Sequence, residues 1–286
     1  DAKGTFQFKK HRTVSGIFQA LKSSAVEEAL DGGSPGHRLG VSGVLDNPQL
    51  QIFSAGAVLA ANDDWASSAS GDGVAATANA FTAAGAFPLD PAAKDAALVR
   101  VLNTGSYTVQ ITASTSSAQA PAAGFGQTDS TGSGLAAAGG PGVALAELYD
   151  TAPSGGARLA NFSARGQVGT GGDVLIGGFT ISGNVPKTVV IRAIGPALTA
   201  FGVAGALADP KLALYRGTAQ LGENDNWGGA AELVTAFSQV GAFALGSGAS
   251  RDAALVVTLA PGSYTAQVSG VNSTTGVGLI EVFEVP

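Results

Sequence analysis

The sequence predicts an all-β protein built from two tandem antiparallel β-sandwich domains of jelly-roll-like type, preceded by a short N-terminal helical segment. Three observations support this fold class. One module is written twice along the chain, its apolar residues alternate in short runs, and Gly, Pro and Asn separate those runs. The chain also has 42 Gly among 286 residues and only 13% charged residues, a composition that suits sheet-rich modules with tight turns.

The repeat is visible as matching segments at fixed distances. The stretch Asn62-Asp63-Asp64-Trp65 returns 162 residues later as Asn224-Asp225-Asn226-Trp227, and KDAALVRVLNTGSYTVQIT returns after 157 residues as RDAALVVTLAPGSYTAQVS. At Glu147 and Glu281 the distance has fallen from 157 to 134, so the first copy holds 23 extra residues between its last two strands. This insertion lies within 113–141, is rich in Gly, Ala and Ser, and is expected to form a long loop.

The spacing divides the chain into an arm at 1–39, a first copy at 40–150 and a complete second copy at 151–286. In the arm, apolar residues from Thr13 to Leu30 fall at helical spacing, and Gly32-Gly33 would end the helix. Three interpretations stay open. The helix packs on the first module, it docks on another subunit, or the segment is not the module's native start.

The two copies begin differently. Ahead of Gly202, the second copy has a stretch that supplies about three strands, whereas the first copy has only the predicted helix in that place. We therefore expect the first copy to lack its initial strands and to leave a sheet edge unpaired. The local helix, the second module or another molecule would then have to cover this edge.

Strand patterns are clearest near the end of each copy. In Ala253–Leu259 the larger apolar residues alternate with smaller or more polar neighbours, and Pro261-Gly262 turns the chain into a second strand through Tyr264. Gly105-Ser106 makes the same turn in the first copy. Further strand-like runs lie at 174–182, 188–194, 212–215 and 277–285.

The second copy reads RLANFSARGQVGTGG, VLIGGFTISGNVPKTVVIRAIGPAL, DPKLALY, NDNW, VGAF and TTGVGLIEVFE in order. These segments resemble a repeated domain frequent in very large secreted or surface proteins of Verrucomicrobia-type bacteria, a resemblance that reaches the first copy from Gly40 onward. The second half is also similar, more loosely, to the bacterial pre-peptidase C-terminal β-sandwich. Both resemblances imply an extracellular accessory or structural module without catalysis of its own.

The Asn-Asp turns are the strongest candidate ligand site. Calcium prefers oxygen ligands from carboxylates, amides and carbonyls, and each turn gathers such groups. The alternative is that the Asn and Asp side chains cap a tight turn. The candidate calcium ligands are Asn62, Asp63, Asp64, Asn224, Asp225 and Asn226.

The two tryptophans allow two interpretations as well. Trp65 and Trp227 could stack on sugar rings and bind a glycan, or each could plug the core of its module. Asp95 and Asp252 follow Lys94 and Arg251, and the simplest interpretation of each neighbouring pair is an exposed ion pair of small energetic value.

Several functions lack the residues they need. Both histidines, His11 and His37, precede the copies, so neither copy holds a Ser-His-Asp triad or a histidine-ligated zinc site. The chain has no Cys, which excludes disulfides and thiolate chemistry. A net charge of −6 without clustered Lys and Arg argues against nucleic acid. The sequence contains no run of about 18 apolar residues, so it predicts no membrane span.

These features favour an extracellular or cell-surface structural protein that is not an enzyme. Its modules would assemble with neighbouring subunits, as a homo-oligomer or polymer, into a filament, sheath or layer. The alternative is a non-catalytic module that binds glycans or matrix within a larger secreted protein. No cofactor is expected, with calcium as the one candidate ion.

Overall fold

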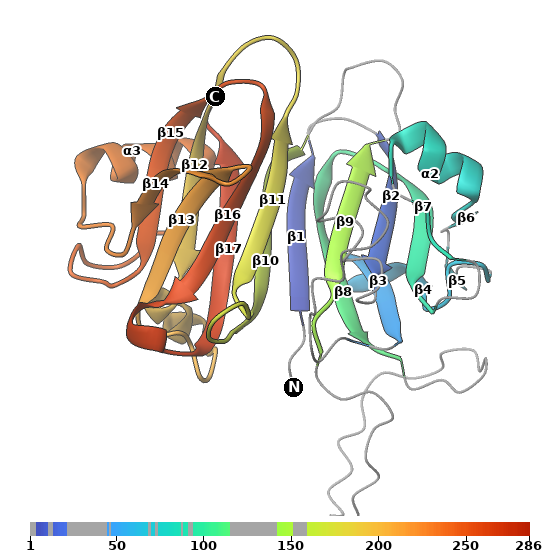
Figure 1. The fold of residues 1–286 in the computed structure, drawn as a ribbon, viewed down its shortest axis with the longest axis horizontal. Coiled ribbons are helices and arrows are strands. Elements are labelled where there is room, and N and C mark those ends of the chain that lie inside the picture. The colour runs from blue at the N-terminus through green and yellow to red at the C-terminus, as the bar shows by residue number, and fades with distance from the viewer. Residues whose placement is uncertain are drawn as a thin grey trace, which may run out of the picture. The chain divides into compact units, whose positions relative to one another are not determined.

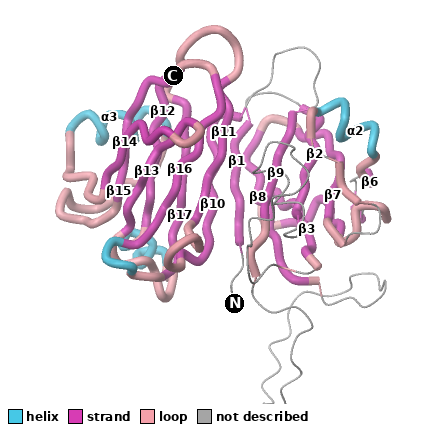
Figure 2. Tube along the Cα trace, viewed as in Figure 1, coloured by secondary structure: helices cyan, strands magenta, loops and turns pink. Residues whose placement is uncertain are grey.

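The computed structural model describes residues 4–10, 14–21, 45, 47–67, 70–71, 74–86, 88–90, 94–114, 142–150 and 159–286. The chain divides into two compact units. Unit 1 comprises Val14–Leu102 and Val109–Ser154, and unit 2 comprises Ala2–Thr13, Asn103–Thr108 and Gly155–Pro286. Strands dominate both units and the helices are short, which confirms the predicted all-β class (Figures 1 and 2).

Unit 2 contains two antiparallel sheets. In the first, the strand order is β15-β12-β17-β10-β1, with bounds Ala253–Leu259, Lys187–Ile194, Gly276–Glu284, Leu159–Val168 and Gly4–Lys10. In the second, the order is β11-β16-β13-β14, with bounds Leu175–Ile181, Gly262–Gly270, Pro210–Arg216 and Ala219–Asn224. The short helical elements are α3, η1 and η2, with bounds Ala231–Val240, Pro196–Phe201 and Val271–Ser273.

The two sheets of unit 2 pack face to face through aromatic side chains. Phe162 of β10 lies 6.4 Å from Phe179 of β11, between ring centroids, and Phe179 in turn stacks on Tyr264 of β16 at 5.7 Å. Helix α3 covers the other face of the first sheet, where Phe237 joins a buried cluster with Trp227. The unit is therefore a sandwich with a helix on its outer side.

Unit 1 repeats this plan. One sheet has the order β6-β7-β2-β9, with bounds Val74–Ala75, Ala96–Leu102, Val14–Leu21 and Leu145–Asp150. The other strands of the first copy follow the order β8-β3-β4-β5, with bounds Gly105–Ala113, Pro48–Ser54, Ala57–Asn62 and Ser70–Gly71. The start of β8, up to Thr108, groups with unit 2. Helix α2 spans Ala78–Ala84; the Thr77 hydroxyl oxygen caps its start, and Gly85 ends it at φ 69°, the left-handed conformation that glycine adopts without strain.

Matching hydrogen bonds show that the sequence repeat is a structural repeat. The Tyr107 hydroxyl donates to the Asn103 carbonyl oxygen at 2.9 Å, and the Tyr264 hydroxyl donates to the Ala260 carbonyl oxygen at 2.7 Å. In both units this bond closes the hairpin turn between the two strands, β7 and β8 or β15 and β16. The predicted hairpins are thus confirmed, including the position of each tyrosine.

The helix predicted over Thr13–Leu30 is wrong for its described part, because Val14–Leu21 forms strand β2. This strand pairs with β7 on one side and β9 on the other. Pairing on both edges satisfies the backbone of β2 in an extended conformation, so apolar residues at helical spacing do not exclude a strand. Gly16 also disfavours a helix, while β-branched and aromatic residues favour a strand. Residues 22–44 lie outside the described residues, as do 115–141 of the predicted insertion.

Strand β2 also corrects the expectation that the first copy lacks all of its initial strands. Leu21 lies opposite Leu145 in β9, as Ile194 of β12 lies opposite Leu279 in β17. Strand β2 therefore takes the place of β12. One difference remains. In unit 2, β10 pairs with the second edge of β17, whereas within the described residues β9 is the last strand of its sheet.

Candidate functional site

The Asn-Asp turn of unit 1 follows directly from the end of β4. Asn62 is 5% exposed; its Oδ1 accepts from the backbone N–H of Ala97 at 3.0 Å, and its Nδ2 donates to the Asp64 carbonyl oxygen at 3.1 Å. Asp63 Oδ2 accepts from the Ser114 hydroxyl at 3.1 Å. The turn therefore fastens the end of β4 to the start of β7 through a single buried amide.

The turn of unit 2 repeats this arrangement. Asn224 Oδ1 accepts from the backbone N–H of Ala254 at 3.0 Å, and its Nδ2 donates to the Asn226 carbonyl oxygen at 3.0 Å. Asn226 Nδ2 donates to Asp225 Oδ1 at 3.2 Å, and both of these residues are exposed. The same two hydrogen bonds, from the strand N–H to the asparagine Oδ1 and from the asparagine Nδ2 to the turn carbonyl oxygen, thus occur in each copy.

These contacts confirm the turn-capping alternative for Asn62 and Asn224. Both ends of each amide have backbone partners, as turn capping requires. Within the described residues no group of three or more His, Cys, Asp or Glu side chains could hold a metal ion. Calcium bound by the remaining turn residues stays a prediction.

Both tryptophans are buried, at 6% exposure. The ring centroid of Trp65 lies 5.3 Å from that of Phe81 in α2, and the centroid of Trp227 lies 5.8 Å from that of Phe237 in α3. Each indole fastens a helix to its sheet, as the core interpretation predicts, and neither presents an open face for a sugar ring to stack on. The described structure therefore lends no support to a glycan site at these two positions.

The indole nitrogens differ between the units. Trp65 Nε1 donates to the Asp90 carbonyl oxygen at 2.9 Å. Trp227 Nε1 is buried without a hydrogen-bond partner within the described residues. The two indole rings therefore pack alike, but only the N–H of Trp65 has a hydrogen-bond partner within the described residues.

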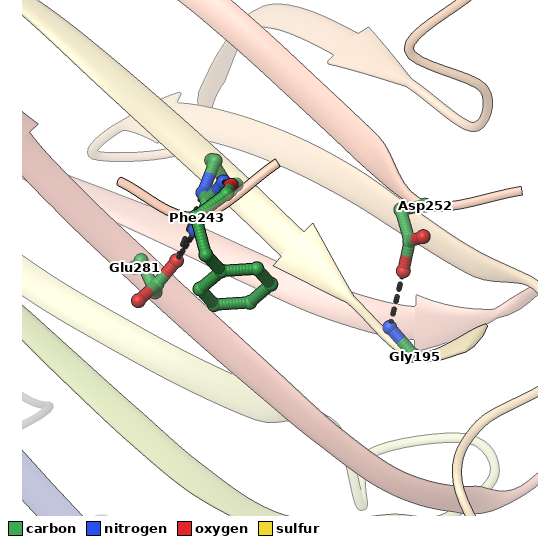
Figure 3. Close-up of polar contacts among 5 residues, drawn as sticks. Gly195, Phe243, Asp252 and Glu281 are labelled. Atoms are coloured by element: carbon green, nitrogen blue, oxygen red, sulfur yellow. Dashed lines mark hydrogen bonds and ion pairs between the residues drawn. The ribbon is translucent and has the colours of Figure 1, made fainter. Parts of the chain in front are cut away.

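The interpretation of Asp95 and Asp252 as exposed partners of a neighbouring cation is wrong. Asp95 is 1% exposed and Asp252 is fully buried. Asp252 Oδ1 accepts from the backbone N–H of Gly195 at 2.8 Å, at the start of η1 (Figure 3). Asp252 Oδ2 accepts from the Ser250 hydroxyl. Arg251 forms its ion pair with Asp209 instead. The sequence did hold a sign of this shared buried role, because Asp-Ala-Ala-Leu occurs at matched positions of both copies.

A buried ion pair in unit 2, between Arg192 and Glu281, was also missed by sequence reasoning. Arg192 lies in the centre of the first sheet and has no exposed surface. Its Nε donates to Glu281 Oε2 at 2.8 Å, Nη2 donates to the same oxygen, and Nη1 donates to the Phe243 carbonyl oxygen (Figure 3). The guanidinium carbon lies 4.4 Å from the Phe243 ring centroid and 4.9 Å from that of Phe237. The signal was a lone arginine inside the apolar run TVVIRAI.

This arrangement is closed. Burial raises the pKa of the Glu281 carboxyl, and the Arg192 charge and its hydrogen bonds oppose that rise. Aromatic rings cover the guanidinium, which leaves it no route to a ligand in solution. The arrangement can hold three elements together, and it offers no group to a substrate.

The corresponding position of unit 1 has lost its cation. Gln19 lies opposite Glu147 in the register that places Arg192 opposite Glu281. Burial raises the pKa of the Glu147 carboxyl, and a hydrogen bond with Tyr149 only partly offsets this effect. Burial, followed by the Glu147 charge, raises the pKa of the Tyr149 hydroxyl. Glu147 Oε2 is buried without a hydrogen-bond partner within the described residues.

Neither the protein-family models nor the curated proteins include a match to this sequence. Among the described residues no helix is long and apolar enough to cross a membrane. The clearest structural difference between the copies is the outer edge of β9, which has no partner strand in the described structure, unlike the matching edge of β17.

Proposed function

We propose that this chain is an extracellular or cell-surface structural protein, not an enzyme, whose β-sandwich modules assemble with neighbouring subunits into a filament, sheath or layer. The observation that supports this proposal is the contrast between β9 and β17. Both strands occupy the same place in their modules, yet only β17 has a partner strand on its second edge in the described structure. A sheet that ends on such an edge is a template for pairing with another chain.

The exposure of side chains along β9 agrees with a missing neighbour. Ile280 and Val282 of β17 are 0% and 5% exposed. Their counterparts in β9 are Ala146, which is exposed, and Leu148, which is half-buried. Apolar positions that one copy buries are therefore left partly open in the other, and association would cover them.

Composition and resemblance add support. Only 13% of residues are charged, so charge repulsion between packed subunits would be small. The motifs of the second copy resemble a repeated domain of large secreted and surface proteins. Together they favour a building unit outside the cell over a soluble enzyme.

Electron microscopy and analytical ultracentrifugation of the purified chain test this proposal. Regular polymers or concentration-dependent oligomers are expected, and Ala146→Lys should reduce assembly by placing a charge on the exposed part of β9. Val101→Lys is the matched control, because Val101 lies in the same sheet and is already 60% exposed. A chain that stays monomeric at every accessible concentration would contradict the proposal.

Calcium is tested separately. Calcium bound at the turns should raise the melting temperature of the wild type but not that of Asp63→Ala or Asp225→Ala. An unchanged melting temperature in the wild type would contradict a calcium site in the turns.

A further inference from the structure

We propose that the outer edge of β9 accepts one extended, antiparallel strand of the β10 type by strand exchange with another copy of this module, whose β10 must first leave its own partners β17 and β1. The inference rests on the proposed function, since it names the partner through which subunits would assemble. In the described structure the matching edge of β17 is already filled by β10, which shows the geometry of such a pairing.

Register identifies the edge. The pairs Leu21–Leu145 and Gly16–Asp150 on the β2 side of β9 match the pairs Ile194–Leu279 and Val189–Glu284 on the β12 side of β17. Because β2 occupies the inner edge of β9, the remaining edge corresponds to the one where β10 pairs with β17. A strand added there would continue the ladder of an existing sheet, the usual mode of β-augmentation.

The β10–β17 register also predicts what the strand must carry toward the core. Phe162 lies opposite Val282, is 7% exposed and packs on Phe179 of the facing sheet. The counterpart of Val282 in unit 1 is Leu148, which is only half-buried. An incoming strand therefore needs a large apolar or aromatic residue opposite Leu148.

On the opposite face the same register predicts a polar residue. Ser163 lies opposite Glu281, and both are buried. In unit 1 the counterpart Glu147 has a buried Oε2 without a hydrogen-bond partner in the described structure, so a hydroxyl or cation opposite it would be favoured.

Net charge agrees. Strand β10, LANFSARGQV, carries Arg165 and no acid, whereas β9, LAELYD, carries two acids and no base. Charges of opposite sign favour this pairing over the pairing of β9 with a second β9, which would place acids against acids.

The first arm of the test uses the full chain and a fluorescent peptide with the sequence of residues 159–168. Binding is followed by anisotropy, and hydrogen exchange is read strand by strand. We expect the amides of Leu145–Asp150 to slow by about tenfold or more at saturation. The same peptide with Phe162→Asp should bind at least about tenfold more weakly, because its carboxylate would face the apolar interior.

Strand β17 is the internal control, since its edge is already covered. The inference is overturned if saturating peptide leaves β9 exchange unchanged, if the Phe162→Asp peptide protects β9 equally, or if only β10 and β17 respond. The peptide acts in trans on the native chain, so no outcome depends on the folding of a variant.

The second arm separates this inference from the proposed function. Assemblies of the chain alone should show slowed exchange in β9 relative to monomers. Assembly with unchanged β9 exchange would retain a structural function and overturn the β9 edge as its interface. A strict monomer whose β9 still binds the peptide would retain the acceptor edge and contradict self-assembly of this chain.

Discussion

The two units share the same Asn-Asp turn and the same buried tryptophan, but they differ in the pairing of their last strands. In both, an asparagine holds the neighbouring strand, a tryptophan fastens a helix, and a tyrosine closes a hairpin. They differ where the last strand meets its neighbours. Unit 2 places Arg192 and Ser163 on either side of Glu281, whereas unit 1 places Gln19 on one side of Glu147 and no described strand on the other.

The difference shows which features the module needs and which it can vary. The Asn-Asp turns and the buried tryptophans join elements within one copy, and both copies keep them. The outer edge of β9 or β17 faces whatever lies beside the module, and at this edge the copies differ. Substitutions at matched positions can therefore separate what is common from what is specific.

The largest effect is expected from breaking the buried ion pair. Glu281→Gln would leave the Arg192 charge without a counter-charge in the core, and removal of one partner of such a pair costs about 3–5 kcal/mol. Strand-resolved hydrogen exchange in β12 and β15 of the full chain measures this loss. Unchanged protection there would show that the pair is not a principal support of unit 2.

The asparagine turns should rank next and affect both units alike. Asn62→Ala and Asn224→Ala each leave a strand N–H, that of Ala97 or Ala254, without its acceptor, at a cost of about 1–3 kcal/mol. Thermal unfolding followed by calorimetry checks the change. A loss confined to one unit would mean that the shared turn has different roles in the two copies.

Replacing the two tryptophans should give a smaller difference in unfolding free energy between the units. Trp65→Phe removes the hydrogen bond to Asp90, whereas Trp227→Phe removes a buried N–H without a partner in the described structure. Both create a similar cavity, so Trp65→Phe should cost about 1 kcal/mol more. Equal losses in urea unfolding would indicate that the Trp65 hydrogen bond contributes nothing net.

The smallest effect has the opposite sign. Burial raises the folded-state pKa of Glu147, so its contribution to stability is present below the ordinary carboxyl pKa and is lost as pH rises through the folded value. Glu147→Gln removes this loss and should stabilise unit 1 at neutral pH by up to about 1 kcal/mol.

Stability of unit 1 measured against pH checks this prediction. The wild type should weaken above the ordinary carboxyl pKa, and the variant should not. Glu281→Gln is its matched control, since the same chemical change destabilises unit 2. A Glu147→Gln variant that is less stable at neutral pH would show that the hydrogen bond between the carboxylate and Tyr149 outweighs the cost of burying its charge.

Much of this fold follows from the sequence because most elements of the module occur twice. Strands and hairpins lie in segments whose local pattern identifies them, whereas the sequence left open whether the tryptophans stack on sugars and whether the asparagines bind calcium. Strand β2 was not predictable in this way, since pairing on both edges overrides the helical spacing of Val14–Leu21.

The buried charges were missed for a related reason. Arg192 and Glu281 are 89 residues apart, and the Asp252 carboxylate accepts from Gly195, 57 residues away. A local pattern shows a charge beside a strand and gives no sign of a partner brought in by tertiary pairing. The two clues in the sequence were the Asp shared by both copies and the lone arginine inside TVVIRAI.

Hydrogen exchange of β9 and β17, compared within one monomeric sample of the full chain, tests the central claim most directly. The account predicts that β17 is protected along its length, whereas alternate amides of β9 exchange at least about tenfold faster because their edge lacks a partner strand. Equal and slow exchange in the two strands would mean that the edge of β9 is already covered, and would contradict the account.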